Sequence, residues 1–352
     1  MAERYAADAL IGFASRLFEA AGFDADKAAT QARLLVEADL MGHDTHGLQL
    51  AAGYLAAARD GRMRTTGEPA VVGETPAVLT LDGDYLPGLW LTDRAVEAAI
   101  VRARTFGVGA VAVRRSHHIG CLATFLPKAT ERGLMLILAS SDPAVAAVAP
   151  FGGRKPLYTP DPIAIGIPTD ADPILIDISA SITTNGMSAR LAGEGRRAAH
   201  RWWLDADGNP SDDPAVMASD PPGSILPVGG LDHGHKGYGL ALMIETLTQA
   251  LSGFGRADGA DRWGASVYVQ ALDPRAFGGR DAFLRQSGWL RAACAANPPR
   301  PGVERVRLPG EAALARRRKA LAEGVALYPA IMPALGAEAQ KLGVPVPRPL
   351  AG

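Results

Sequence analysis

Short apolar segments of the strand type alternate with helical segments through residues 69–176. The segments are bounded by Gly, Pro or Asp, which end strands and form turns. The predicted strands are 70–72, 77–81, 110–113, 134–138, 163–167 and 174–176, and the predicted helices between them are 92–104 and 122–131. Such alternation is typical of an α/β protein, in which helices cover a sheet. The sequence therefore predicts a mixed α/β core, which we assign to residues 69–304.

Helices are predicted at both ends of the chain, outside this core. Apolar residues at helical spacing give the following helices: 6–20, a second one capped by Asp24 or Asp26, 311–322 and 329–342. We expect the N-terminal helical segment, 1–68, to pack with the C-terminal helices of 305–352.

Two segments near the end of the core contrast in composition. Residues 205–224 are rich in Asp, Pro and Gly and predict an ordered surface loop. Residues 237–252 predict a helix that ends at Gly253. Because Glu245 is its single charged residue, we expect this helix to be almost fully buried.

Composition excludes several classes of protein. Apolar residues make up 48% of the chain, which is enough to form a packed core and excludes a disordered protein. Lys plus Arg number 36 and Asp plus Glu number 37, so no excess of positive charge attracts a nucleic acid. No apolar run approaches the roughly 18 residues of a membrane helix, and the first segment is amphipathic, unlike a signal peptide. With only two cysteines, a cytoplasmic protein is expected, with neither a nucleic acid nor a membrane as partner.

The sequence contains no standard nucleotide-binding loop. Residues 107–112 (GVGAVA) match the pattern G-x-G-x-x-A, but they follow a helix and lead into a strand, which reverses the order of a Rossmann site. We interpret them as a turn. A second candidate is the start of the 237–252 helix, where His235 and Lys236 lie among glycines. A helix N-terminus beside a lysine favours an anion, whereas the alternative is that the glycines serve packing and Lys236 is solvated.

The histidines are concentrated in three motifs. Six of the seven form the pairs His43/His46, His117/His118 and His233/His235. Histidine is the usual proton carrier of enzymes because its pKa lies near neutrality. His118 follows a predicted strand, where α/β proteins place ligands. The alternatives are structural histidines, or a metal site at His43 and His46, whose spacing differs from that of the zincin motif.

Six segments together resemble the type-2 lactate/malate dehydrogenase family, which is unrelated to the Rossmann lactate and malate dehydrogenases. They are GHDTHGL (42–48), SHHIG (116–120), ILIDIS (174–179), WLDADGNPSDDP (203–214), GHKGYGLALMIETL (234–247) and LPGE (308–311), in the family's order. The resemblance implies a non-Rossmann mixed α/β fold with helical N- and C-terminal segments, NAD or NADP as cofactor, and a homodimer. It implies that 1–68 and 305–352 form a substrate and dimer domain beside a cofactor-binding core. The implied substrates are small 2-hydroxy or 2-oxo acids and related ketones or cyclic imines.

The resemblance also assigns roles to single residues. His46 resembles the proton donor of the family, Thr45 stands at the position of a relay serine or threonine, and His118 resembles the acid/base histidine of some members. The implied cofactor-binding residues are Ser140, Asp177, Ile178, Ser179, His235, Lys236, Pro309, Gly310 and Glu311. The implied substrate-binding residues are Thr159, Asn185 and Gly186. No metal is implied.

The chain departs from the family at the substrate. Leu50 stands where the family usually has an arginine that binds the substrate carboxylate, and leucine cannot form that bidentate pair. Met187 stands where the imino acid reductases have a relay aspartate. We therefore expect a pocket that accepts a less charged ketone, a cyclic imine or a larger alcohol, with Arg114 or Arg115 as replacement anchors.

The choice between NAD and NADP is left open by the sequence. Arg305, Arg307 and the arginines at 316–318 lie near the LPGE segment. They either bind the 2′-phosphate of NADP or form a solvated face of the C-terminal helix. Two other functions are also weighed. One is a non-catalytic nucleotide-binding paralogue, which has no need for a proton donor such as His46. The other is metal-dependent hydrolysis, for which sensitivity to a chelator is the test.

Overall fold

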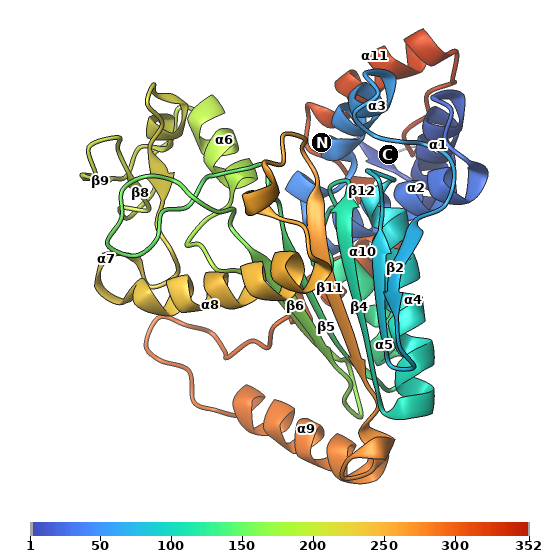
Figure 1. Ribbon diagram of the computed structural model, residues 1–352, viewed down its shortest axis with the longest axis vertical. Helices are drawn as coiled ribbons and strands as arrows, with labels where there is room; N and C mark the ends of the chain where they lie inside the picture. Colours follow the sequence, from blue (N-terminus) through green and yellow to red (C-terminus); the bar gives the residue numbers. More distant parts are fainter. Residues whose placement is uncertain (1–2, 351–352) are drawn as a thin grey trace.

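A seven-stranded mixed sheet forms the centre of the protein (Figure 1). The computed structural model describes residues 3–350. The strands, in their order across the sheet, are β2 (Ala70–Glu74), β3 (Val78–Asp82), β4 (Val108–Ser116), β11 (Ala265–Leu272), β5 (Met135–Ser141), β6 (Pro162–Ile167) and β7 (Ile174–Ser179). β3 and β4 are parallel, and the other neighbouring strands are antiparallel. The mixed α/β core is confirmed.

The central strand, β11, was not predicted from the sequence. It pairs with β4 on one side and with β5 on the other. Val267, Tyr268 and Val269 are residue types common in strands, and from Val267 on the side chains alternate between buried and half-buried. The strand signal is therefore present in the sequence, although no strand was assigned to it. Helix α9 (Arg280–Ala295) was also not predicted, because it is largely exposed and offers few apolar positions at helical spacing.

The sheet separates two hydrophobic cores, because successive side chains of a strand point to opposite faces. Leu136 and Leu138 of β5 belong to the core that contains helix α4 (Gly88–Phe106). Ile137, between them, packs against the core that contains Ala241 and Ile244 of helix α8 (His235–Glu245). The α4 side is also where the N-terminal helices pack.

The two ends of the chain lie side by side (Figure 1). The helices there are α1 (Ala7–Ala20), α2 (Ala25–Met41), α3 (Ala51–Arg59), α10 (Glu311–Glu323) and α11 (Ile331–Leu342). α10 packs on α2, and α11 packs on α3 and α1. Strand β1 (Arg4–Tyr5) pairs with β12 (Val325–Ala326). Residues 1–2 of the predicted segment 1–68, and residues 351–352 of the predicted segment 305–352, lie outside the described residues. The division of the chain into domains stays a prediction.

The predicted surface loop at 205–224 contains more regular structure than expected. Strand β9 (Pro210–Ser211) lies within it, and strand β10 (Ser224–Ile225) begins at its last residue. The two pair on either side of β8 (Trp203–Leu204), which comes just before the segment. The remaining short helices of the chain are α5 (Pro127–Thr130), α6 (Asn185–Gly193) and α7 (Gly230–His233). The Asp- and Pro-rich segment thus forms a small three-stranded sheet together with β8, which precedes it.

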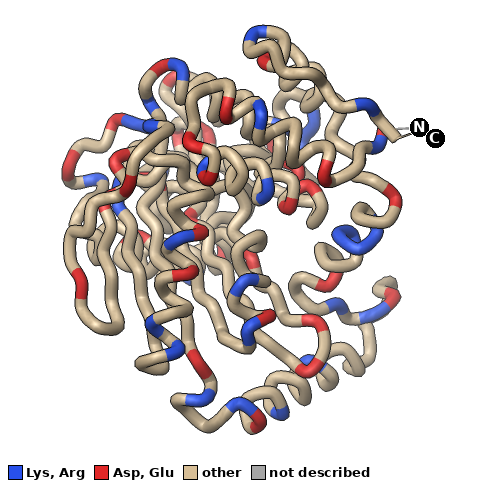
Figure 2. The backbone as a smooth tube through the Cα atoms, turned by 90° about the vertical axis from the view of Figure 1, so that its right-hand side faces the viewer, with Lys and Arg blue, Asp and Glu red and all other residues tan. Residues whose placement is uncertain are grey.

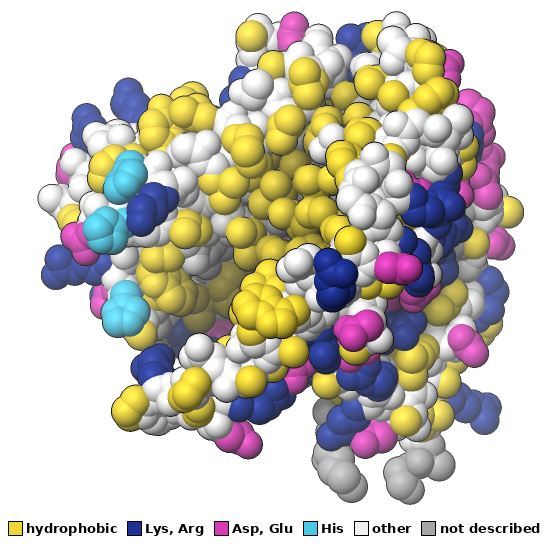
Figure 3. Space-filling view, turned by 90° about the horizontal axis from the view of Figure 1, so that it is seen from below, with side chains coloured by type: hydrophobic (Ala, Val, Ile, Leu, Met, Phe, Trp, Pro, Cys, Tyr) yellow, Lys and Arg dark blue, Asp and Glu magenta, His cyan; other side chains and the backbone are white. Residues whose placement is uncertain are grey.

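The expectation that the 237–252 helix is almost fully buried is wrong. α8 continues through a π-helical turn (Thr246–Ala250), and Gly253, at a φ of +71°, ends it as predicted. Leu242, Met243 and Leu251 are 49%, 44% and 56% exposed, because no described segment of this chain covers that side of the helix. Hydrophobic side chains also gather around a hollow on the face shown in Figure 3.

Two local predictions have different outcomes. Gly107 ends α4 at a φ of +83° and forms the turn, but residues 108–112 already belong to strand β4, so the interpretation of 107–112 as a turn holds for Gly107 alone. A Cβ at Gly109 would lie 2.1 Å from the carbonyl oxygen of Ala99, so this glycine lets the strand pack closely on α4. Asp24 does occupy the N-cap position of α2, but its carboxylate accepts hydrogen bonds from Lys27 Nζ and Gly67 N instead of capping the helix.

The surface is mixed in charge. Acidic and basic residues are interspersed along the chain in Figure 2, as the net charge of −1 leads one to expect. Within residues 3–350, no helix has the length and apolar character to cross a membrane. Cys121 and Cys294 are unpaired.

Candidate active site

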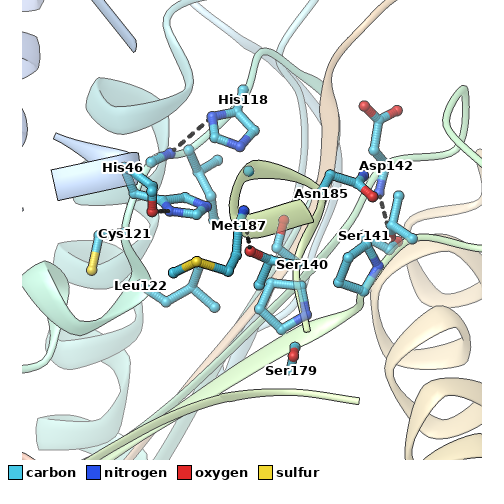
Figure 4. Close-up of a pocket in the computed structure, with 18 of the residues that line it drawn as sticks. His46, His118, Cys121, Leu122, Ser140, Ser141, Asp142, Ser179, Asn185 and Met187 are labelled. Atoms are coloured by element: carbon cyan, nitrogen blue, oxygen red, sulfur yellow. Dashed lines mark hydrogen bonds between the residues drawn. The ribbon is translucent and has the colours of Figure 1, made fainter. Parts of the chain in front are cut away.

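A cavity of about 600 Å³ brings together most of the residues singled out from the sequence (Figure 4). The following predicted residues line it: Thr45, His46, His118, Ser140, Thr159, Asp177, Ile178, Ser179, Asn185 and Gly186. They come from the loop after α2, the ends of β4, β5 and β7, and the start of α6. Both departures from the family, Leu50 and Met187, line it as well.

His46 is held by a short 3₁₀ turn (Asp44–His46) and by the residue that follows. Its Nδ1 atom lies 2.9 Å from Thr45 Oγ1, so the two residues share a hydrogen bond. Gly47 lies against the buried carboxyl group of Asp39, where a Cβ would be only 2.3 Å from Oδ1. Asp39 Oδ2 also accepts a hydrogen bond from the Leu48 N–H at 2.8 Å. Asp39 therefore fixes the backbone on which His46 is placed.

His118, just beyond β4, is held in one tautomer. The backbone N–H of Gly120 donates to its Nδ1 atom at 3.3 Å, and Tyr54 Oη lies 2.7 Å from the same atom. Because a backbone N–H can only donate, Nδ1 is an acceptor and the neutral ring carries its proton on Nε2. His118 therefore offers an N–H donor at Nε2.

The rings of His46 and His118 lie close together beside Trp263. The two imidazole centroids are 6.1 Å apart, and the ring of His118 stacks on Trp263 at 5.0 Å. The two imidazole rings thus lie in the wall of one cavity, which Asn185 and Met187 of α6 also line (Figure 4).

Both of these histidines are neutral near pH 7. Burial, aided by His43, lowers the pKa of His46 to about 4, although Asp44 opposes the shift. Burial also holds the pKa of His118 well below 6.5, and the neighbouring His46 and His117 act in the same direction. Neutral imidazoles accept a proton from an alcohol, or donate the Nε2 hydrogen to an oxygen that gains negative charge.

The preceding histidine, His117, is a core residue. It is 1% exposed, and its ring meets Tyr54 and Trp263 edge-on at 5.4 and 4.9 Å. Burial lowers the pKa of its imidazole to about 3. The structural interpretation therefore applies to one member of the His117/His118 pair.

A second cavity, of about 450 Å³, adjoins the first. The two share His43, Asp177 and Ile178 in their walls. Pro309 and Gly310 line the second cavity, and the Pro309 carbonyl accepts a hydrogen bond from Leu175 N of β7. Glu311 begins α10 beside this cavity, with its carboxylate bound to Leu308 N and Arg305.

His235 and Lys236 lie elsewhere. Both are exposed in the first turn of α8 and line neither cavity. The exposure of Lys236 agrees with the alternative in which this lysine is solvated. The assignment of these two residues to the cofactor phosphates stays a prediction.

The predicted replacement anchors, Arg114 and Arg115, are both engaged. Each forms an ion pair with Asp82, and neither lines the large cavity. That part of the prediction is wrong. In the described part of the chain, the cavity wall contains no lysine or arginine, and its acidic residues are Asp142 and Asp177.

Sequence reasoning did not find four residues that shape the site. They are Asp39, Tyr54, Asp142 and Trp263. Asp142 lines the cavity, and burial raises the pKa of its carboxyl group to about 6, against the hydrogen bonds from Ala144 and Gly264. Each belongs to a segment with no motif, and only the packing of distant segments brings it to the histidines.

The residues present fit a dinucleotide. The paired cavities form an extended space, in contrast to a compact pocket for a single ring. The hydroxyl and amide groups of Ser140, Ser179 and Asn185 face one end, and apolar residues such as Leu175 and Pro309 line the other. Such a combination suits a ligand with flat rings and polar linkers.

A metal site is a competing arrangement. His43, Cys121 and Asp177 have ligand atoms within 4.8 Å of one another, whereas His46 is not part of this group. The Asp177 carboxylate already accepts hydrogen bonds from Ala123 N at 2.9 Å and from the Cys121 thiol at 3.6 Å. The predicted alternative of His43 with His46 is therefore not the arrangement that the fold assembles.

Comparison with known proteins places this site in a family. The model of the malate/L-lactate dehydrogenase family matches residues 5–336. The chain is 32% identical over 337 residues to an L-lactate dehydrogenase of Cupriavidus necator, which covers 92% of this chain and 93% of that protein. It is 37% identical over 238 residues to a (2R)-3-sulfolactate dehydrogenase (NADP(+)) of Chromohalobacter salexigens, which covers 67% of this chain and 68% of that protein.

The fold agrees with these matches. The structure of malate dehydrogenase from Pyrococcus horikoshii superposes with a TM-score of 0.86 at 26% identity, over 97% of this chain and 96% of that one. The chain therefore belongs to the malate/L-lactate dehydrogenase family and is an oxidoreductase.

Proposed function

We propose that this protein is an NAD(P)-dependent dehydrogenase or reductase that interconverts a small 2-hydroxy acid, or a related alcohol or amine, with its oxo or imine form. The observation that carries the proposal is the pair of neutral histidines, His46 and His118, on one wall of a cavity that continues into a second one. A bound nicotinamide would supply or accept the hydride.

The protein's own residues handle the proton. In the direction of oxidation, His46 accepts the proton of the substrate hydroxyl, and Thr45 Oγ1 orients the ring through Nδ1. His118, fixed by Tyr54 and Gly120, presents Nε2–H to the substrate oxygen. In the direction of reduction the same groups return the proton. Thr159, Asn185 and Gly186 complete the substrate end of the proposed site.

The cofactor would be held by residues of both cavities. Ser140, Asp177, Ile178 and Ser179 line the large one, and Pro309 and Gly310 line the small one, with Glu311 beside it. In this proposal the described part of the core 69–304 binds the cofactor, and the packed helices from both chain ends form the substrate and dimer domain.

We propose a homodimer as the functional form. Leu242, Met243 and Leu251 expose the apolar side of α8, and Trp289 and Leu290 of α9 are 67% and 51% exposed. Exposed apolar surface on helices is typical of an interface, and twofold symmetry is the commonest way in which identical chains cover it. The unpaired cysteines support a reducing compartment, the cytoplasm.

The first test is binding, measured as a shift in the thermal unfolding temperature with NAD⁺, NADH, NADP⁺ and NADPH. A ligand that binds the folded state raises this temperature. We expect a shift with at least one oxidised and reduced pair, followed by turnover of 2-oxo acids, ketones or cyclic imines. Absence of any shift at millimolar cofactor would refute the proposal and favour the non-catalytic paralogue.

A further inference from the structure

Five arginines lie near the small cavity, and the structure divides them into two groups. Arg305, Arg317 and Arg318 form ion pairs with Glu311, Glu37 and Asp172. Arg307 and Arg316 form no ion pair or side-chain hydrogen bond with any other residue of the described range 3–350. The sequence alone could not make this distinction for Arg317 and Arg318, because their carboxylate partners, Glu37 and Asp172, come from distant segments.

The two unpaired arginines are also the ones that line the small cavity. Arg307 lies in the irregular segment before Pro309, and Arg316 lies on α10. The side chain of Arg316 packs over Gly42, so closely that a Cβ on this glycine would be 2.8 Å from Cδ and 3.1 Å from Nη1. His43, which both cavities share, lines the small cavity together with Arg316.

The other residues of the small cavity offer little negative charge to neutralise Arg307 and Arg316. Its wall is mostly apolar, with Leu175, Pro309 and Ala313 among its residues. Its carboxylate, Asp177, is hydrogen-bonded to Ala123 N and Cys121, and burial raises the pKa of this carboxyl group. Exposed arginine is ordinary on a helix, but two unpaired guanidinium groups at one apolar cavity form a site for an anion with several oxygens.

The position of the histidines decides which part of a dinucleotide reaches this cavity. Under the proposed function, on which this inference rests, the nicotinamide lies beside His46 and His118 in the large cavity. The adenosine half then extends past Asp177 and Ile178 into the small one. In dinucleotide sites in general, a carboxylate reads the ribose 2′-hydroxyl of NAD, and an arginine reads the 2′-phosphate of NADP.

We infer that Arg307 and Arg316 bind the 2′-phosphate of NADP(H), and that this enzyme prefers NADP(H) to NAD(H). Arg305, Arg317 and Arg318 keep their carboxylate partners and take no part in this choice.

The inference is tested on the whole protein by calorimetric titration with two fragments, 2′,5′-ADP and 5′-AMP. They differ only in the 2′-phosphate, and their binding requires no turnover. We expect 2′,5′-ADP to bind at least about tenfold more tightly, because charge-assisted hydrogen bonds to phosphate are the stronger kind. Arg307→Ala and Arg316→Ala should each weaken it by about tenfold or more and leave 5′-AMP unchanged.

Arg318→Ala is the matched control, because it removes the same charge from the same helix at a residue paired with Asp172. It should leave both fragments unaffected. Arg307→Lys keeps the charge without the planar fork and should give an intermediate affinity. Higher ionic strength should weaken 2′,5′-ADP more than 5′-AMP.

The outcomes separate this inference from the proposed function. Equal affinity for both fragments and for NADH and NADPH, unchanged in the arginine variants, overturns the inference while the dinucleotide site stands. A preference for NADH overturns it in the same way. Absence of binding by both fragments and all four dinucleotides overturns the proposed function together with it.

Discussion

The large and small cavities share a wall but offer different chemistry. The large one is lined by histidines whose pKa values burial holds low, with Asp142 and Asp177 as its acidic residues. The small one is apolar and carries Arg307 and Arg316. Proton transfer and anion binding are thus assigned to opposite ends of one site. The comparison teaches that a binding defect and a catalytic defect can be produced separately in this protein.

The largest expected effect comes from removing the histidines of the large cavity. The double variant His46→Ala/His118→Ala should lower kcat by at least about 10²–10⁴-fold, because proton transfer by a positioned group contributes this much. The affinity for the cofactor should not change, since the small cavity is intact. Steady-state kinetics and cofactor titration measure the two effects. Normal turnover in the double variant would contradict the assignment.

A second change gives the large cavity the positive charge that it lacks. Leu50→Arg should raise kcat/KM for a 2-oxo acid by about tenfold or more relative to its uncharged methyl ester, because a guanidinium forms a bidentate pair with a carboxylate. Leu50→Met is the control, with similar volume and no charge. Equal effects on the acid and the ester would show that position 50 does not contact the carboxylate.

A third change acts on the backbone that carries His46. Gly47→Ala would force a Cβ into the Asp39 carboxyl group, 2.3 Å from Oδ1. We expect it to lower the free energy of unfolding by about 1–3 kcal/mol, as overpacking does, and to lower kcat. Gly53→Ala is the control, because no atom lies within 4 Å of its added Cβ. Denaturant titration checks both, and similar stability of the two variants would argue against the role of Asp39.

The pH profile tests the charge state of the histidine end. Burial lowers the pKa of His46 to about 4, so the free base is present at neutral pH. For alcohol oxidation, kcat/KM should therefore not decline near pH 6.5 as it would for an ordinary histidine, but closer to pH 4. A decline near pH 6 would instead report Asp142, the pKa of which burial raises to about 6. Asp142→Asn would then remove it.

The smallest expected effect concerns the residues at the shared wall. Dialysis against a chelator should leave both kcat and cofactor affinity unchanged, because the proposed proton carriers need no metal. A loss restored by Zn²⁺ would assign the ion to His43, Cys121 and Asp177, whose ligand atoms lie within 4.8 Å of one another. Cys121→Ser would then abolish the restoration.

The elements of the fold that could be predicted from the sequence are mostly those with a clear local pattern of apolar residues and turn residues. The terminal helices and most strands of the core were predicted close to their bounds, because an amphipathic helix and a short strand between turn residues leave signals within about 15 residues. β11 was missed although its residues alternate between buried and half-buried positions, and only the sheet pairing showed that it is the central strand. The prediction that α8 is almost fully buried was wrong, because apolar composition does not tell whether another segment of the same chain packs over the helix.

The candidate site divides in the same way. The motif residues Thr45, His46 and His118 could be named from the sequence, since glycines and histidines in short motifs carry the resemblance to the family. Tyr54 and Trp263 could not be, because they contact His118 from segments that are 64 and 145 residues away in the chain. The distinction between His117 and His118 likewise depended on which ring the packing buries.

The sequence by itself determined the fold class, the family and the histidines that we propose as proton carriers, because each depends on patterns in contiguous residues. Only the tertiary structure decided the charge state of those histidines, the tautomer of His118, and which arginines are free to meet an anion. The physical reason is that pKa values and ion pairing depend on burial and on partners across space. Two such partners are Asp82, which forms ion pairs with Arg114 and Arg115, and Asp172, which forms one with Arg318.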